Sequence, residues 1–130
     1  MFRFVLTLAC LVAAADFTKI QVDQVFTCKY QKNWQMSILY YEFDLLTKNE
    51  RLFETAEVKV TNRGKATVSE NFDVTGGDGR FDPTYDMYMK VTHTCSRGGG
   101  IVEHKKFLGL VDVDSETASF GETYELGDFV

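Results

Sequence analysis

Two histidines and two cysteines carry the side chains of this sequence that are best suited to metal binding. His93 and Cys95 are two positions apart and would share one face of a β-strand, whereas Cys28 and His104 come from distant segments. A zinc site needs three or four such ligands, and these four could supply them. Cysteines oxidised to a disulfide cannot bind zinc as thiolates. We therefore expect no metal site and interpret His93 as a hydrogen-bonded histidine beside a cystine, with partial exposure at a sheet end as the alternative.

Four aspartates in and around a glycine-rich stretch could bind a cation. Asp73, Asp78, Asp82 and Asp86 offer oxygen ligands for Ca²⁺, but their spacing does not match the EF-hand pattern. Residues 76–79, Gly-Gly-Asp-Gly, lack the preceding strand, the following helix and the lysine of a phosphate-binding loop. We expect a solvated loop here, and a weak extracellular calcium site is the alternative.

The sequence shows no pattern typical of a catalytic nucleophile. It contains neither a nucleophile elbow nor a catalytic-cysteine signature. We therefore predict that the protein is not an enzyme and that it uses no cofactor.

The charge of the chain argues against a nucleic-acid partner. Among 130 residues, 14 are Lys or Arg and 19 are Asp or Glu. Affinity for nucleic acids comes mainly from basic side chains that neutralise phosphates, and no long basic run occurs. We interpret the one modest basic cluster, Arg97, Lys105 and Lys106, as a solvated face rather than as a lipid head-group site.

The first 15 residues have the pattern of a secretory signal peptide. Arg3 precedes an apolar run, and Ala13 and Ala15 occupy the −3 and −1 positions of a cleavage site before Asp16. The run is shorter than the roughly 20 apolar residues that a transmembrane helix needs. We predict a secreted protein whose mature domain comprises residues 16–130.

Cleavage of this leader would change both the charge and the cysteine count. Loss of Arg3 lowers the basic count from 14 to 13 against 19 acidic residues, which gives a net charge of −6. Loss of Cys10 leaves Cys28 and Cys95, an even number in an oxidising compartment. We expect these two to form a disulfide, and two buried free thiols are the alternative.

Alternating apolar and polar residues predict an all-β domain, and no segment keeps a helical period for three turns. In residues 85–95, Met87, Met89 and Val91 would share the buried face with His93. Gly64 can adopt a positive φ, which predicts a hairpin between two strands. Seven or eight short strands favour an antiparallel β-sandwich. The expected strands are residues 19–30, 36–46, 53–61, 66–72, 85–95, 101–113 and 120–130.

Four segments, taken in order, resemble a known family. Residues 22–28 are Val-x-Gln-x-Phe-x-Cys, residues 60–68 are Val-Thr-Asn-Arg-Gly-Lys-Ala-Thr-Val, residues 87–95 are Met-Tyr-Met-Lys-Val-Thr-His-Thr-Cys, and residues 124–129 are Tyr-Glu-Leu-Gly-Asp-Phe. In these segments the chain resembles the nematode transthyretin-like family of small secreted proteins, which have a transthyretin-type (prealbumin-like, Ig-like) β-sandwich. Gln24 stands where that family usually has glycine.

The resemblance implies an extracellular binding protein without catalytic activity. It would act as an adaptor or effector that recognises a protein or a cell-surface lipid. The alternative is a carrier of a small apolar ligand or hormone, as vertebrate transthyretin is. A more remote alternative is a hydroxyisourate hydrolase, but that enzyme family ends in Tyr-Arg-Gly-Ser and residues 126–130 here are Leu-Gly-Asp-Phe-Val. The binding surface and the oligomeric state stay open at this point.

Overall fold

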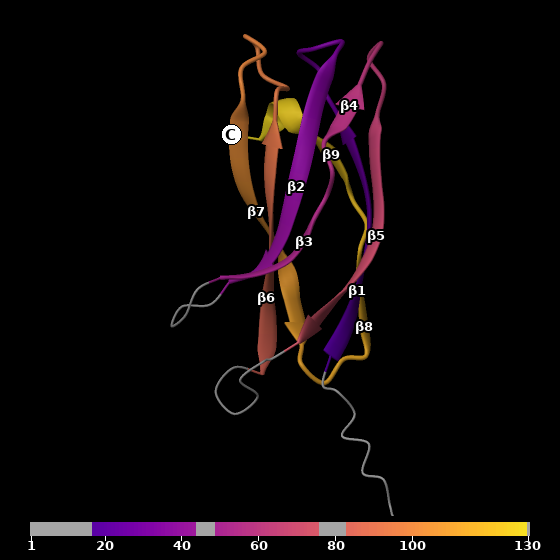
Figure 1. The fold of residues 1–130 in the computed structure, drawn as a ribbon, viewed down its shortest axis with the longest axis vertical. Coiled ribbons are helices and arrows are strands. Elements are labelled where there is room, and N and C mark those ends of the chain that lie inside the picture. Colours follow the sequence, from indigo (N-terminus) through magenta and orange to yellow (C-terminus); the bar gives the residue numbers. More distant parts are fainter. Residues whose placement is uncertain (1–16, 44–48, 76–82, 130) are drawn as a thin grey trace, which may run out of the picture.

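Two β-sheets packed face to face make up the described part of the protein (Figure 1). The computed structural model describes residues 17–43, 49–75 and 83–129. Within these ranges no α-helix is long and apolar enough to span a bilayer. The elements are, in chain order, β1 (Phe17–Thr27), β2 (Trp34–Glu42), β3 (Glu50–Glu54), β4 (Val58–Val60), β5 (Ala66–Thr75), β6 (Thr84–His93), β7 (Val102–Asp112), β8 (Thr117–Phe120), β9 (Thr123–Glu125) and the 3₁₀ helix η1 (Leu126–Asp128).

The two sheets differ in how their strands are paired. In the five-stranded sheet, β2 lies between β6 on one side and β3 and β4 on the other, β7 follows β6, and every pair is antiparallel. In the four-stranded sheet, β1 pairs antiparallel with β5, while β8 and β9 pair with β1 in parallel. The predicted β-sandwich is present, but the prediction of a purely antiparallel one is wrong for these two strands.

The inner faces of the sheets form one hydrophobic core, as the period-two pattern predicts. In β6, Met87, Met89 and Val91 are fully buried, and the residues between them are half buried. In β1, Ile20 and Val22 are fully buried and alternate with exposed polar residues. Burying each large apolar side chain in this way contributes about 1.5–3 kcal/mol.

Gln24 keeps its place on the inner face of β1 although it is polar. Its side chain is fully buried, and the hydroxyl of Tyr40 in β2 donates a 2.5 Å hydrogen bond to its Oε1. Burial raises the pKa of Tyr40, so this hydroxyl keeps its proton. The bond therefore joins the two sheets through the middle of the core.

The segment predicted as one strand over residues 53–61 is divided into β3 and β4. Thr55 lies at the break, where its backbone N–H donates to the carbonyl of Ile38 and its Oγ1 accepts from the Ile38 N–H, both at 2.9 Å. These two bonds continue the pairing with β2, so both short strands belong to the same sheet edge.

The hairpin predicted at residues 62–65 is wrong, because β4 and β5 belong to different sheets. The chain crosses between the sheets here, and the positive φ angles fall on Asn62 (55°) and Arg63 (57°) rather than on Gly64. The Arg63 N–H donates to the carbonyl of Lys32 at 2.9 Å, which holds the crossing in place.

The strand predicted over residues 120–130 is also wrong in extent. Within residues 120–129, Phe120 ends β8, β9 is only three residues long, and η1 follows it. Glu125 accounts for the change, because its carboxylate accepts a 3.0 Å hydrogen bond from the Gly127 N–H at the start of η1. At Gly127 a Cβ atom would meet the ring of Tyr30 at 2.8 Å, so glycine permits this close packing.

Candidate functional site

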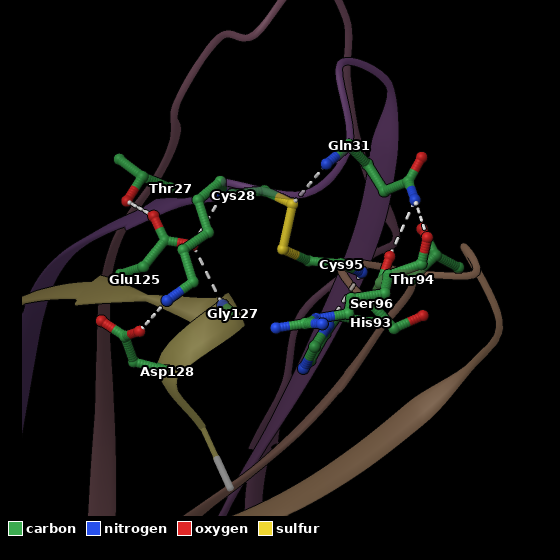
Figure 2. The surroundings of a disulfide bond; sticks show 12 residues. Thr27, Cys28, Gln31, His93, Thr94, Cys95, Ser96, Glu125, Gly127 and Asp128 are labelled. Atoms are coloured by element: carbon green, nitrogen blue, oxygen red, sulfur yellow. Dashed lines mark hydrogen bonds and ion pairs between the residues drawn. A yellow bond between two sulfur atoms is a disulfide. The ribbon is translucent and has the colours of Figure 1, made fainter.

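The disulfide connects the two sheets at one end of the sandwich (Figure 2). Cys28 directly follows β1 and Cys95 lies two residues after β6, and their sulfurs are bonded with Cα atoms 5.7 Å apart. The Gln31 N–H donates to the Cys28 sulfur at 3.2 Å. These are the two cysteines that the sequence analysis pairs.

A carboxylate fixes the C-terminal segment beside the disulfide. Glu125 accepts hydrogen bonds from the Thr27 hydroxyl and from the Lys29 N–H, each at 2.7 Å, in addition to the Gly127 N–H (Figure 2). Lys29 also forms an ion pair with Asp128, and the hydrogen bond to that carboxylate raises the pKa of Lys29. The end of β1 and η1 therefore form one connected unit.

Gln31 connects the two loops that carry the cysteines. Its side-chain amide nitrogen donates to the carbonyls of Ser96 at 2.7 Å and of Arg97 at 3.2 Å. The loop after β6 also includes a glycine-rich turn at residues 96–100, where the Gly99 N–H donates to the Ser96 carbonyl at 3.1 Å. Both loops are thus held by hydrogen bonds as well as by the disulfide.

His93 is a buried histidine beside the cystine, as the sequence predicts. It is 2% exposed, and its Nδ1 accepts a 2.9 Å hydrogen bond from the Cys95 N–H. Its ring stacks on that of His104 in β7, with the ring centroids 5.5 Å apart. Burial, and secondarily the charge of His104, lower the pKa of His93 to about 4, so the ring is neutral at neutral pH.

The residues considered for metal binding are not assembled into a metal site in the described ranges. No group of three or more His, Cys, Asp or Glu side chains is arranged to hold an ion among residues 17–43, 49–75 and 83–129. The calcium hypothesis concerns Asp78 and Asp82, which lie outside the described residues, and Asp73 and Asp86, which lie in β5 and β6. The predicted signal peptide, residues 1–15, also lies outside them.

Aromatic side chains cover part of the solvent-facing side of the five-stranded sheet. Tyr41 in β2 lies directly opposite Tyr88 in β6, and their rings stack with centroids 5.6 Å apart. Tyr88 in turn contacts Phe107 in β7 at 5.1 Å and Phe43 at 5.7 Å. Leu110 lies next to them on β7 and is 62% exposed. We call these five residues the aromatic face.

Charged side chains of both signs surround the aromatic face. Lys90 lies 4.0 Å from Glu103 across the β6–β7 pair, and Arg51 forms a 2.6 Å ion pair with Glu54 on β3. Beside them is a hollow of about 120 Å³, whose lining includes Tyr41, Arg51, Lys90 and Lys105. The surface therefore has an apolar centre and a polar, nearly balanced rim.

The solvent-facing side of the four-stranded sheet is mostly polar by contrast, although Phe17 at the start of β1 is 46% exposed. On β1, Lys19, Gln21 and Asp23 point outward and are exposed. Asp23 accepts hydrogen bonds from Gln21 at 2.8 Å and from the Ser69 hydroxyl at 2.7 Å. Asn71 on β5 is exposed as well. We call this surface the polar face.

Sequence reasoning did not identify the aromatic face. One signal was visible, because residues 38–41 are apolar at both parities and so predict a strand covered on both sides. The structure provides that cover, since Tyr41 is only 6% exposed beneath Tyr88. Trp34 and Tyr85, near the starts of β2 and β6, are core residues that are 4% and 1% exposed.

Comparisons with known proteins identify no family for this chain. No protein-family model and no curated protein matches it. Among solved structures, a 9R-lipoxygenase from Cyanothece shares 13% sequence identity and covers 85% of this chain, with a TM-score of 0.37. This chain spans only 16% of that protein. A likeness at this level supports no conclusion about fold or activity.

Proposed function

We propose that the protein is a secreted, non-catalytic binding protein of the transthyretin-like type, an adaptor or effector, and that it binds a protein through the aromatic face. One observation carries this proposal: on the outer side of the five-stranded sheet, four aromatic rings are in contact, and beside them Phe107 and Leu110 are 48% and 62% exposed. Exposed apolar side chains grouped in this way mark interaction sites in soluble proteins.

The composition of the aromatic face matches the centre of a protein interface. Tyrosine and phenylalanine are enriched in such centres, where rigid rings bury a large area at a low entropic cost. The rings of Tyr41 and Tyr88 are already stacked, so binding would not have to order them. A polar rim that excludes water, such as the ion pairs of Lys90 and Arg51, is typical of the surroundings of an interface centre.

The charges on the rim favour a protein partner over a lipid surface. Anionic membranes attract clusters of lysine and arginine, and each such residue near the surface contributes about 1 kcal/mol. Here Lys90 faces Glu103 and Arg51 faces Glu54, so two of the three cations that line the hollow are offset. Alternating charges of both signs are better matched by the mixed surface of another protein.

The disulfide supports the proposal that the protein is secreted. Stable disulfides are rare in the reducing cytosol and common in secreted proteins, and Cys28 and Cys95 are bonded in this structure. Residues 1–15 have the leader pattern that would deliver the chain to such a compartment.

Quantitative capture from extracellular material tests the proposal. The mature protein is immobilised as wild type, as the aromatic-face variant Phe107→Ser/Leu110→Ser, and as the polar-face control Ser69→Ala/Asn71→Ala. We expect wild type and control to retain the same amount of at least one protein. The amount retained by the aromatic-face variant should be at least tenfold lower, because an interface hot spot contributes on the order of 2 kcal/mol.

Three outcomes would contradict this proposal. Retention of the same proteins by Phe107→Ser/Leu110→Ser would exclude the aromatic face as the binding surface. Sedimentation with anionic vesicles that depends on these two residues would identify a lipid partner instead. A tetramer in size-exclusion chromatography that dissociates in the Phe107→Ser/Leu110→Ser variant would show that the face binds further copies of this chain, as a carrier with a channel between subunits would require.

A further inference from the structure

The buried imidazole of His93 carries a hydrogen-bond donor that no described residue satisfies. Because Nδ1 accepts from the Cys95 N–H, the proton of the neutral ring lies on Nε2. The Nε2 atom is inaccessible to solvent in this structure and has no partner among the described residues. A buried donor without an acceptor is unfavourable, so an acceptor that reached this atom would stabilise the site.

A cavity lies beside this ring. It has a volume of about 140 Å³, and its lining includes His93, His104, Arg97 and Ser96. One water molecule takes up about 30 Å³ in the liquid, so the cavity has room for a group of a few heavy atoms. The disulfide and the Gln31 hydrogen bonds fix its walls at the end of the sandwich, on the side shown in Figure 2.

The charged groups around the cavity are mainly cationic, although the chain as a whole has a net charge of −5. Arg97 stacks on Tyr30 with its guanidinium carbon 5.4 Å from the ring centroid, so this charge is positioned at the cavity wall. A second hollow of about 280 Å³ also has His104 in its lining and adds Lys105, Lys106 and Asp128. The carboxylate of Asp128 is offset by its ion pair with Lys29. The positive charge of this region is therefore not balanced locally.

The tautomer of His93 decides which kind of ligand fits. A metal ion would need a lone pair on Nε2, but this nitrogen carries the proton as long as Nδ1 accepts from Cys95. An N–H donor next to a guanidinium is suited to an acceptor oxygen that bears negative charge, because charge-assisted hydrogen bonds to such oxygens are the stronger ones.

We propose that this cavity binds a small oxyanion, a carboxylate or phosphate group, that pairs with Arg97 and, after a movement of the His93 ring that opens its Nε2–H to the cavity, accepts from this donor. The site is separate from the aromatic face, so it gives the protein a second ligand of a different class. It uses the basic residue Arg97, which the sequence alone suggests only as part of a solvated surface.

Nitrogen-15 NMR of the histidine side chains tests the proposal on the mature, disulfide-bonded protein. Inorganic phosphate and sodium acetate are titrated in separate arms, with sodium chloride at matched ionic strength as the reference. We expect a saturable shift of the His93 Nε2–H resonance with one or both oxyanions and no saturable shift with chloride. The arm that saturates at the lower concentration distinguishes phosphate from carboxylate.

A matched pair of arginine variants separates this site from general charge effects. Arg97→Gln should weaken the titration at least about fivefold, because a charged hydrogen-bonding partner contributes on the order of 1 kcal/mol or more. Arg51→Gln, which removes the same charge from β3, should leave it unchanged. Failure of the His93 resonance to saturate in both oxyanion arms, or equal titration of Arg97→Gln and wild type, would overturn the proposal. Both outcomes are independent of whether the aromatic face binds a protein.

Discussion

The two solvent-facing sides of this sandwich cover the same core but differ in chemistry. The polar face presents Lys19, Gln21 and Asp23 in the alternation expected for a sheet with one side in water. The aromatic face breaks that rule, because Tyr88 and Phe107 lie where polar residues would suffice for folding. The core requires only the inward residues of each strand. The aromatic residues on the outside are therefore better explained by binding than by folding.

The largest effect on stability is expected from removing the disulfide between the two sheets. The Cys28→Ser/Cys95→Ser variant loses the disulfide that cross-links them. In the chain-entropy model, a cross-link between residues 67 apart contributes about 4 kcal/mol to the free energy of unfolding. Urea denaturation should show a loss of this size. A loss below about 1 kcal/mol would mean that the core alone joins the sheets.

The next effect concerns the pH dependence of stability. His93 has a folded-state pKa of about 4, below the ordinary histidine value of 6.5, so the unfolded chain takes up a proton first as the pH falls. Stability from the neutral ring is complete above about pH 6.5 and is lost towards pH 4. Between these limits the unfolding free energy should fall by about 3 kcal/mol, since one pKa unit corresponds to about 1.4 kcal/mol.

Two histidine variants test whether His93 causes this pH dependence. His93→Gln should remove most of the slope of unfolding free energy against pH, and His104→Gln, on the neighbouring strand, should keep most of it. A His93→Gln protein with the wild-type slope would show that other groups cause the effect.

A smaller effect on stability is expected from removing the hydrogen bond between Tyr40 and Gln24 inside the core. Tyr40→Phe leaves the Oε1 of Gln24 buried without its partner, which should cost about 1–2 kcal/mol in unfolding free energy. The double variant Gln24→Leu/Tyr40→Phe removes both polar groups and should recover part of that loss. Additive effects of the two single substitutions would show that the hydrogen bond is not a coupled contact between the sheets.

The smallest effects on stability are expected on the two outer faces. Phe107→Ser should cost under about 1 kcal/mol, because its ring is 48% exposed and it contacts only the edge of the stack at Tyr88. Asn71→Ala on the polar face should change stability by less than about 0.5 kcal/mol. Thermal unfolding of both variants checks this, and a loss of several kcal/mol for Phe107→Ser would give the aromatic face a structural role.

The sequence predicts the inner face of each strand well, because burial imposes a period of two. It does not predict which sheet a strand joins, and the crossing at Asn62 and Arg63 depends on a distant hydrogen bond to the Lys32 carbonyl. The parallel pairing of β8 and β9 with β1 is likewise a property of the whole fold.

The aromatic face depends on strand register, which sequence patterns do not give. Tyr88 lies opposite Tyr41 on β2, and it lies opposite Phe107 only because the β6–β7 register shifts next to Gly109, which has a φ of 157°. Without that bulge, the alternation along β7 would place Leu110 on the inner side of the sheet. The orphan Nε2 of His93 depends in the same way on the three-dimensional position of the Cys95 N–H.

Site-specific photo-crosslinking tests the central claim most directly. A photoreactive phenylalanine analogue replaces Phe107 on the aromatic face or Asn71 on the polar face, and each protein is irradiated in extracellular material. We predict a discrete adduct with a partner protein from position 107 that excess unlabelled wild-type protein suppresses, and no such adduct from position 71. Equal labelling from the two positions, or a suppressible adduct from position 71 alone, would contradict the assignment of binding to the aromatic face.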